Sequence, residues 1–429
     1  MRARVVVVGG GVMGVSIAWH LARRLDPHTE PVVLLEKKAL AAGSSGKSGA
    51  ILRQFYGDRE VAAMARDSLR VFQGFEHATG RSIGFMGCGV LTLASRAKPG
   101  EAELVERNVA MMQSLGIDVE LLDAPKLRAL VPGLVASDAT IAAWEPRAGA
   151  VDPVKTVEAF AALAREHGAV TRVGVRVEEL VVERGRVRGV RTDDGVIECE
   201  QVVVATGPWT RTLLARAGVE LPLRVVKPEQ HFLALPTHRA PGAPRIESHT
   251  LTGHGRSMEE ELYARFGLAS SAPSEAPHPV LLDLEHGFYS RCELANLRTR
   301  VGHMDYASDA EVVDPDAVTD EVSDEFKAWA RAKLASRLPT YAERDDAGSF
   351  CGLYTLTPDA QAIVGPLPNI EGAFVAAGFS GHGFKLSPSI GEGVAQLLCG
   401  TPVSAFEPTF FTPTRLTKPT PKSPIAFGL

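Results

Sequence analysis

The chain has 429 residues, a formal net charge of −5 at pH 7 and a sequence pI near 6.2. Its length predicts two domains, and its acidic balance argues against a nucleic-acid-binding protein, which would carry a basic surface. Hydrophobic residues make up 45% of the chain and charged residues 23%, as in ordinary globular proteins. No apolar run approaches the roughly 18 residues of a membrane-spanning helix, so we expect no membrane span.

The five cysteines are odd in number and far apart, and no two form a C-x-x-C pair. This pattern predicts free thiols and no metal site. The chain enters an apolar strand at once, which leaves no room for a signal peptide. We therefore expect a cytoplasmic protein.

The first motif lies within residues 3–36. An apolar run, Val5–Val8, predicts a buried strand. It leads into Gly9-Gly10-Gly11-Val12-Met13-Gly14, a G-x-G-x-x-G, and then into an apolar helix face. A second apolar strand, Val32–Leu35, ends on Glu36. Strand, glycines, helix, strand and terminal acid in this order predict a dinucleotide site.

Each residue type in this motif has a physical role. Gly9 makes the tight turn, Gly11 lets the backbone approach a pyrophosphate, and Gly14 lets helix and strand pack closely. The helix N-terminus presents unpaired N–H groups to the phosphates, and Glu36 accepts hydrogen bonds from a ribose diol. These residues alone leave open whether the dinucleotide is FAD or NAD.

The next part of the chain alternates between helical and strand patterns. Small residues dominate 41–50 and predict a close approach of the backbone to a bulky group, although a flexible surface loop has the same composition. Helices are expected at 58–74, 101–115, 122–130 and 153–168, and strands at 84–93, 141–144, 170–182 and 187–191. Another apolar strand, Val202–Ala205, runs into Thr206-Gly207, where we expect either a second backbone contact with the dinucleotide or an ordinary turn.

The last part of the chain contains a segment without regular pattern. Residues 236–279 are rich in Pro, Gly, His and Ser, which suits either a disordered insertion or a functional lid. An amphipathic helix is expected at 321–338 and another at 387–398. Strands are expected at 280–283, 287–291, 297–302, 350–355, 362–364 and 372–376. The final helix follows a glycine-rich stretch at 378–385.

Four motifs together resemble a known family. They are GGGVMG with Glu36, ATGPW at 205–209, GLYTLTPD at 352–359 and GFSGHGFKLSP at 378–388. Their order resembles the D-amino-acid oxidase superfamily of FAD-dependent oxidoreductases, and in particular its sarcosine oxidase-like branch. The resemblance spans the whole chain. It implies an α/β fold (α+β overall), with a Rossmann-like FAD-binding domain at 1–83, 146–220 and 348–429 and a substrate domain with a mixed or antiparallel sheet at 84–145 and 221–347.

The resemblance also decides in favour of FAD, here bound non-covalently. It implies that the first strand–helix–strand unit holds the adenosine end and that the C-terminal glycine-rich turn approaches the flavin. The cofactor-binding residues that it implies are Gly9, Gly11, Val12, Met13, Gly14, Glu36, Lys37, Ser44, Ser45, Lys47, Val177, Thr206, Gly207, Gly381, His382, Gly383, Phe384 and Lys385.

For the substrate, the resemblance implies that Arg53 and Lys385 grip a carboxylate, and that Tyr354 and His382 line the substrate side of the flavin. Arg300 stands where the family has a lysine that promotes the reaction with O₂. Four of these five residues have a structural alternative. Arg53 could form a surface ion pair, Lys385 could contact only flavin or phosphate, His382 could be a packed loop residue, and Arg300 could be a strand residue facing solvent.

Two positions depart from the family pattern. The family's flavin-tethering cysteine lies two residues before its tyrosine, whereas Cys351 lies three residues before Tyr354 and Gly352 fills the tethering position. A side chain one residue out of register faces the other side of a strand, which predicts no covalent link. Ala50 or its neighbour replaces a second arginine of the family, so sarcosine itself is not singled out as the substrate.

We expect an enzyme that oxidises the C–N bond of a small amino acid with a secondary or substituted amine. The hydride equivalent would pass to flavin N5, the imine would hydrolyse, and O₂ or another acceptor would reoxidise the flavin. A dehydrogenase of 2-hydroxy acids or glycerol phosphate is an alternative on the same fold. Another is the flavin subunit of a multi-protein amino-acid dehydrogenase, and a homo-oligomer is compatible with the sequence.

Overall fold

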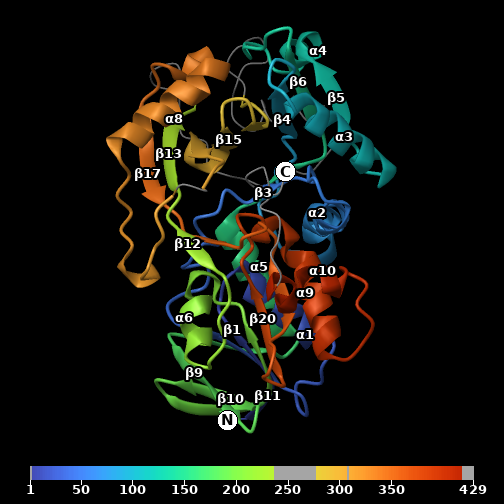
Figure 1. Cartoon of the computed structure of the whole chain (residues 1–429), viewed down its shortest axis with the longest axis vertical. Helices are drawn as coiled ribbons and strands as arrows, with labels where there is room; N and C mark the ends of the chain where they lie inside the picture. Colours follow the sequence, from blue (N-terminus) through green and yellow to red (C-terminus); the bar gives the residue numbers. More distant parts are fainter. Residues whose placement is uncertain (1, 236–276, 307–308, 418–429) are drawn as a thin grey trace.

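The computed structural model describes residues 2–235, 277–306 and 309–417, so most of the segment 236–279 lies outside the described residues. Two eight-stranded sheets organise the chain. In Figure 1 the first sheet, with β1, β11 and β20, occupies the lower half, and the second, with β13, β15, β4 and β6, occupies the upper half.

The first sheet has the order β19-β20-β11-β1-β2-β8, and the β9–β10 hairpin extends from β11. Pairing is parallel from β20 through β11, β1 and β2 to β8. Val5 and Val7 face one hydrophobic cluster and Val6 and Val8 another, which explains the uninterrupted apolar run of this strand. The strands are β1 (Arg2–Val8), β2 (Val32–Glu36), β8 (Val170–Val173), β9 (Val177–Glu183), β10 (Arg186–Thr192), β11 (Gly195–Val204), β19 (Ile363–Pro366) and β20 (Ala373–Ala377).

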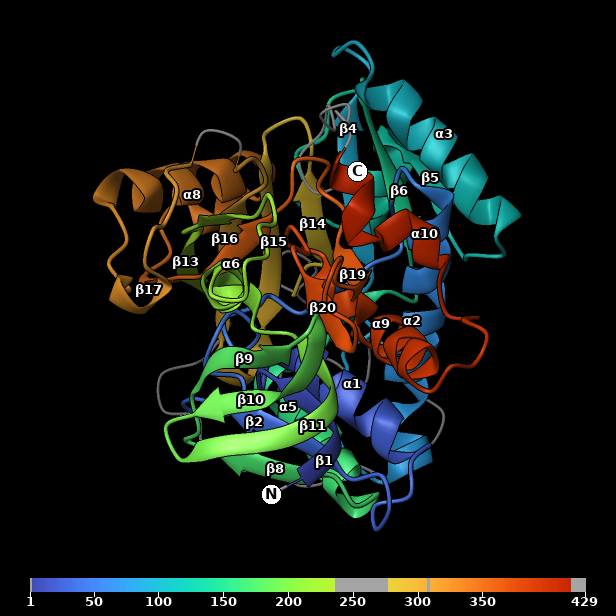
Figure 2. The ribbon, with the colours of Figure 1, turned by 60° about the horizontal axis from the view of Figure 1, so that its bottom comes forward.

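Three helices pack together beside this sheet (Figure 2): α1 (Val12–Ala22), α5 (Pro153–Glu166) and α9 (Gly383–Leu398). The contact between α1 and α9 is very close. A Cβ added at Gly391 would lie 2.2 Å from the Ser16 hydroxyl oxygen, and that hydroxyl donates to the Ser387 carbonyl at 2.7 Å. The helix that follows the glycine motif is therefore joined directly to the helix that carries Lys385.

The second sheet has the order β17-β13-β16-β15-β14-β4-β6-β5 and is antiparallel except for the β14–β4 pair. Helices α3 (Glu101–Ser114), α4 (Ala124–Leu130) and α8 (Asp324–Arg337) lie beside it in Figure 1. Its strands are β4 (Val90–Ser95), β5 (Glu120–Asp123), β6 (Thr140–Glu145), β13 (Glu229–Ala234), β14 (Val280–Asp283), β15 (Phe288–Glu293), β16 (Arg298–His303) and β17 (Asp346–Cys351).

The remaining α-helices and four short strands complete the fold. Asp58 caps the long helix α2 by accepting from the backbone N–H of Glu60 and Val61. Two small antiparallel pairs, β3–β7 and β12–β18, lie outside both sheets. These elements are α2 (Arg59–Thr79), α6 (Thr210–Ala215), α10 (Pro408–Phe411), β3 (Ile51–Leu52), β7 (Gly149–Ala150), β12 (Arg224–Val226) and β18 (Tyr354–Leu356).

The predicted fold class is confirmed by two mixed sheets and flanking helices. The division into domains stays a prediction, and β17 crosses its boundary at 347/348. The expected strand at 170–182 is two strands, because Gly174 with φ +83° interrupts it. No helix in the described parts of the chain is long and apolar enough to cross a membrane.

The start expected for the last helix was wrong. It begins at Gly383, four residues before Ser387, and so includes Lys385 in its first turn. Pro388 lies inside α9, where it lacks the N–H that would bond the Phe384 carbonyl. The Ser387 hydroxyl donates to that carbonyl at 2.8 Å instead, so the helix continues through the proline.

Candidate active site

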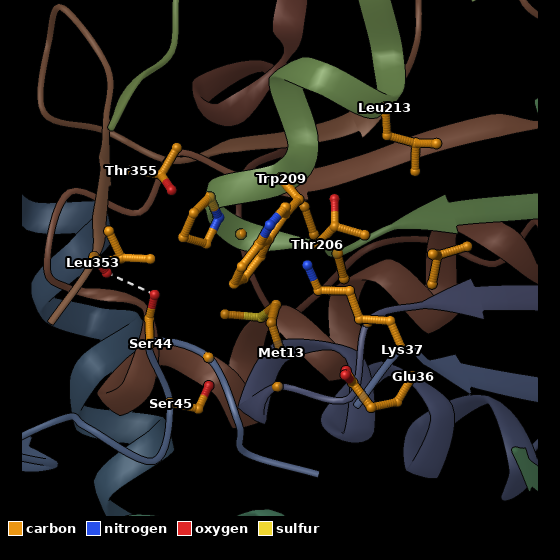
Figure 3. Close-up of a pocket in the computed structure, with 18 of the residues that line it drawn as sticks. Met13, Glu36, Lys37, Ser44, Ser45, Thr206, Trp209, Leu213, Leu353 and Thr355 are labelled. Atoms are coloured by element: carbon orange, nitrogen blue, oxygen red, sulfur yellow. Dashed lines mark hydrogen bonds between the residues drawn. The ribbon is translucent and has the colours of Figure 1, made fainter. Parts of the chain in front are cut away.

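A cavity of about 290 Å³ opens where β1, β2 and β11 end. Its wall includes Val8, Leu35 and Ala205, each at or just after the carboxyl end of a parallel strand. Ligands of open α/β sheets bind at this edge, where loops from neighbouring strands meet. Figure 3 shows side chains from several parts of the chain converging on this cavity.

The three motif glycines have backbone geometries that fit the roles predicted for them. Gly9 has φ +115°, and a Cβ there would lie 2.4 Å from the Ala205 carbonyl oxygen. A Cβ at Gly14 would lie 1.9 Å from the Gly9 carbonyl oxygen, so only glycine lets α1 pack this closely on the turn. Gly11 lines the cavity, and a Cβ there would meet the Ser45 hydroxyl oxygen at 3.0 Å. The turn therefore brings bare backbone to the cavity.

Glu36 ends β2 with its carboxylate in the cavity wall. One carboxylate oxygen accepts the Gly10 backbone N–H at 2.7 Å and the other accepts the Lys38 N–H at 2.8 Å. A carboxylate has about four acceptor positions, so two N–H donors leave room for the hydroxyls of a ligand. The carboxylate is thus held in place and can accept further hydrogen bonds.

The opposite wall comes from the segment after β11 and from β18. The Lys37 ammonium lies 3.7 Å from the centre of the Trp209 ring. Figure 3 shows these two side chains beside each other. The indole Nε1 of Trp209 and the hydroxyl of Thr355 are buried without a hydrogen-bond partner among the described residues. Both residues line the cavity. Buried polar atoms are normally paired, so these two indicate that a polar ligand belongs here.

The small-residue segment 41–50 forms another wall. Ser44 donates to the Leu353 carbonyl at 2.6 Å (Figure 3), and Ser45 accepts the Val12 N–H at 2.9 Å. Both serines line the cavity as expected, but Lys47 does not. Its ammonium points to the Asp320 carboxylate and to the Cys351 carbonyl, 2.9 Å away, because these partners lie on the other side of the loop.

Fourteen of the eighteen predicted cofactor residues line this cavity. The other four are Gly14, Lys47, His382 and Lys385. Gly14 acts through packing, and Lys385 lines a neighbouring cavity. The fourteen are Gly9, Gly11, Val12, Met13, Glu36, Lys37, Ser44, Ser45, Val177, Thr206, Gly207, Gly381, Gly383 and Phe384.

A second cavity of about 50 Å³ adjoins the first. The two share four lining residues, Ser48, Tyr354, Gly381 and Phe384. Arg53 and Lys385, predicted to act together, both line the second cavity. Its remaining wall is the segment Gly49–Ile51 and three residues from the second sheet or just after it, Leu282, Tyr289 and Met304. A small space with two basic groups therefore opens onto the dinucleotide cavity.

Both basic groups are buried, with Arg53 4% and Lys385 8% exposed. Burial lowers the pKa of Lys385 well below its usual value, and the charge of Arg53 lowers it further. The Arg53 guanidinium donates to the Phe55 carbonyl and lies 4.2 Å from the centre of the Tyr56 ring. An entering anion would offset the positive charge that disfavours protonation of Lys385.

Arg300 and His382 line neither cavity. The Arg300 guanidinium lies 2.7 Å from the Glu293 carboxylate and donates to the Lys47 carbonyl at 2.8 Å. Arg300 is 3% exposed, so the alternative of a strand residue facing solvent is wrong. His382 precedes α9, and its Nδ1 lies 3.4 Å from the Tyr56 hydroxyl. Both side chains lie behind the residues that form the cavity walls.

Cys351 also lies away from both cavities. It ends β17, is buried, and its thiol donates to the Glu321 carbonyl at 3.1 Å. Gly352, at the tethering position, has no thiol to offer. This geometry supports the prediction of a non-covalent flavin.

One group of acidic and histidine side chains could hold a metal in the described ranges: Asp283, Glu285 and His286. The Arg337 guanidinium already pairs with both carboxylates, at 2.6 Å from each. The group is therefore explained as a buried ion pair.

Comparisons with known proteins agree with this geometry. Residues 4–397 match the family described as FAD dependent oxidoreductase. The chain belongs to this family. The resemblance to the D-amino-acid oxidase superfamily and its sarcosine oxidase-like branch is confirmed, and FAD is the cofactor. The cavity fits FAD through its bare glycine turn, the Glu36 carboxylate and the two unpartnered polar atoms of Trp209 and Thr355.

Individual relatives lie at moderate identity. The chain is 29% identical over 404 residues to 4-methylaminobutanoate oxidase (formaldehyde-forming) of Paenarthrobacter nicotinovorans, covering 94% of this chain and 44% of that protein. It therefore spans less than half of that relative. It is 26% identical over 408 residues to monomeric sarcosine oxidase of Bacillus sp. (strain NS-129), covering 92% of each. The L-proline dehydrogenase from P. horikoshii shares the fold, with a TM-score of 0.79, 24% identity and coverage of 97% of this chain and 98% of that one.

Sequence reasoning missed several residues of the two cavities. Trp209 stands in the ATGPW motif but was not assigned, although a tryptophan directly after a dinucleotide turn is a usable signal. Tyr289 lies in an expected strand and Met304 just after one, both without a motif, so only the fold brings them to the second cavity. Thr355 sits on β18 beside Tyr354, and its side chain lines the first cavity.

Proposed function

We propose that this chain is a flavoenzyme that oxidises the C–N bond of a small amino acid with a secondary or substituted amine. The observation that carries the proposal is the second cavity. It joins the dinucleotide cavity at Tyr354 and Phe384, and it is lined by two basic side chains, Arg53 and Lys385. Two basic side chains in one small pocket suit a carboxylate, which accepts charge-assisted hydrogen bonds.

In this proposal the protein mainly positions the substrate. Arg53 and Lys385 hold the carboxylate, and Arg53 can do so with its planar fork of donors. Such a grip would orient the amine-bearing carbon toward the dinucleotide cavity, which removes much of the entropic cost of reaction. FAD held by the first cavity would supply the acceptor for the hydride equivalent released from that carbon. Hydrolysis of the imine by water, before or after its release from the protein, gives a carbonyl compound and the free amine.

The size of the cavity supports a small substrate. A volume of about 50 Å³ is well below the range of drug-sized pockets. The lining also contains Leu282, Tyr289 and Met304, which suits an alkyl substituent on the amine. Two relatives are named for N-methylated amines, 4-methylaminobutanoate and sarcosine, which supports a substituted amine here as well.

Anaerobic bleaching of the flavin tests the proposal. The purified holoenzyme is mixed without oxygen with N-methyl amino acids, cyclic amino acids, D- and L-amino acids, 2-hydroxy acids and glycerol 3-phosphate. We expect loss of the visible flavin absorbance with at least one small secondary amino acid. Bleaching by 2-hydroxy acids or glycerol 3-phosphate alone would replace the proposal with the alternative chemistry. Co-purification of a second chain would indicate a subunit of a larger dehydrogenase.

A further inference from the structure

A buried carboxylate lies close to the second cavity and has no role in the function proposed above. Glu145 is the last residue of β6, is 0% exposed and lines neither cavity. Its carboxylate accepts the backbone N–H of Gln54 at 2.6 Å and that of Phe55 at 3.3 Å. It also accepts the side-chain amide of Gln54 at 3.2 Å. Glu145 therefore binds a short piece of backbone directly after Arg53.

This piece of backbone has no regular structure of its own. Strand β3 ends at Leu52 and helix α2 begins at Arg59, so neither a sheet nor a helix supplies acceptors to the buried amides between them. The Arg53 guanidinium donates to the Phe55 carbonyl, on the residue whose N–H Glu145 accepts. The place of the guanidinium thus depends on the peptide that Glu145 holds.

The charges of the site also connect Glu145 with Arg53 and Lys385. Arg53 and Glu145 both act on the pKa of Lys385, and Glu145 is the group that opposes the lowering by burial and by Arg53. Burial raises the pKa of Glu145 to about 7, against the hydrogen bonds from Gln54 and the charge of Arg53. A buried carboxylate persists when hydrogen bonds and nearby cations compensate for lost hydration, and this site supplies both.

We propose that Glu145 is a positioning residue that holds Arg53 in place for the substrate carboxylate. The inference rests on the proposed function in one respect, the assignment of Arg53 to the carboxylate. The competing explanation is that Glu145 merely satisfies two buried amides. That role would make it important for folding but not for the affinity of the cavity for a carboxylate.

Binding of acetate to the oxidised holoenzyme distinguishes the two explanations. Acetate is a carboxylate small enough for the cavity, and its binding is followed by the change in the visible flavin spectrum. The titrations are made above the pKa of about 7 that burial gives Glu145, so that the parent carboxylate is charged. Glu145→Gln then removes the charge at nearly constant volume, and Glu145→Asp keeps the charge but shortens the reach. We expect the acetate Kd to rise at least tenfold in Glu145→Gln and at least fivefold in Glu145→Asp, with FAD content unchanged.

Asp152→Asn is the matched control. Asp152 also accepts two backbone N–H groups, those of Val154 and Lys155 at 2.9 Å each, but lies outside both cavities. We expect its acetate Kd to stay within twofold of the parent. Neutral acetamide is the matched probe, and its weaker binding should change less than threefold in every variant.

A double-mutant cycle provides a result that a purely structural role would not give. In an Arg53→Ala background, Glu145→Gln should raise the acetate Kd by less than threefold further, because the residue that Glu145 positions is gone. Parent-like acetate binding in both Glu145 variants would overturn the inference. So would full additivity of the two substitutions, or a parent holoenzyme that binds no acetate.

The proposed function and this inference can fail separately. If no amino acid bleaches the flavin but acetate binding still depends on Arg53 and Glu145 together, the proposed reaction is wrong and the positioning role stands. If amino acids bleach the flavin and acetate binding ignores Glu145, the reaction stands and the positioning role is wrong. Should Glu145→Gln not fold, Glu145→Asp and the double-mutant cycle built on it decide the question.

Discussion

Truncating Arg53 to alanine is the most direct test of how the second cavity recognises its substrate. The guanidinium is buried at 4% exposure and lines the cavity together with Lys385. A hydrogen bond to a charged group contributes about 1.5–3 kcal/mol, and Lys385 remains to hold part of the carboxylate. We therefore expect a loss of about 2–3 kcal/mol in transition-state binding, which is about 30- to 150-fold in kcat/KM.

The assay is anaerobic stopped-flow reduction of the flavin by the best amino acid from the bleaching panel. It separates the substrate Kd from the limiting rate of reduction, and we expect most of the loss in Kd. Arg53→Lys is the control, because it keeps the charge but loses the planar fork, and its loss should be smaller. An Arg53→Ala variant that reduces as efficiently as the parent would refute the carboxylate role of Arg53.

Four further predictions concern the cofactor, oxygen and stability. Glu36→Leu should weaken FAD retention, measured as the ratio of flavin to protein after gel filtration, because each charge-assisted hydrogen bond lost costs about 1.5–3 kcal/mol. Acid precipitation should leave a yellow supernatant, because the flavin is bound non-covalently. Flavin in the pellet would indicate a covalent link, and Cys351 is the cysteine nearest in sequence to the family's tethering position. Arg300→Met should slow reoxidation of the flavin by O₂ at least tenfold in stopped-flow mixing, while reduction by the substrate changes little. Unchanged reoxidation would mean that Arg300 has only a structural role. Asp283→Asn should cost about 3 kcal/mol of unfolding free energy in urea at pH 7, the lower end of the range for a broken buried ion pair, because Arg337 loses the Asp283 carboxylate but keeps that of Glu285. Hydrogen bonds from His286 and Arg337 hold the pKa of Asp283 below 3.8 despite burial, so this cost should shrink as the pH falls below that value.

The sequence predicted well those parts of the site whose geometry is local. The glycine motif and Glu36 lie within one strand–helix–strand unit, so their spacing alone determines where they meet. Lys47 shows the opposite case, because its direction depends on Asp320, a partner 273 residues away in the chain. His382 likewise turns toward Tyr56, which no local pattern reveals.

Only part of the lining of the second cavity could be predicted, for the same reason. Arg53 and Lys385 stand in or near motifs that the resemblance identifies. Tyr289 and Glu145 stand in strands whose alternation shows that one face is buried but not what it is buried against. Which residues Tyr289 and Glu145 contact depends on how the two sheets pack, and that packing depends on contacts between distant parts of the chain.

The close contact of α1 with α9 has a consequence for how this protein can change its substrate. Because Gly391 leaves no space beside Ser16, a shift of the helix that carries Lys385 would also displace the helix after the glycine turn. The position of Lys385 is therefore coupled to the helix that follows the cofactor-binding turn. Leu282, Tyr289 and Met304 carry no such constraint from the dinucleotide cavity, because none of them lines it. Substitutions at these three positions can therefore change the substrate while the residues that bind FAD stay the same.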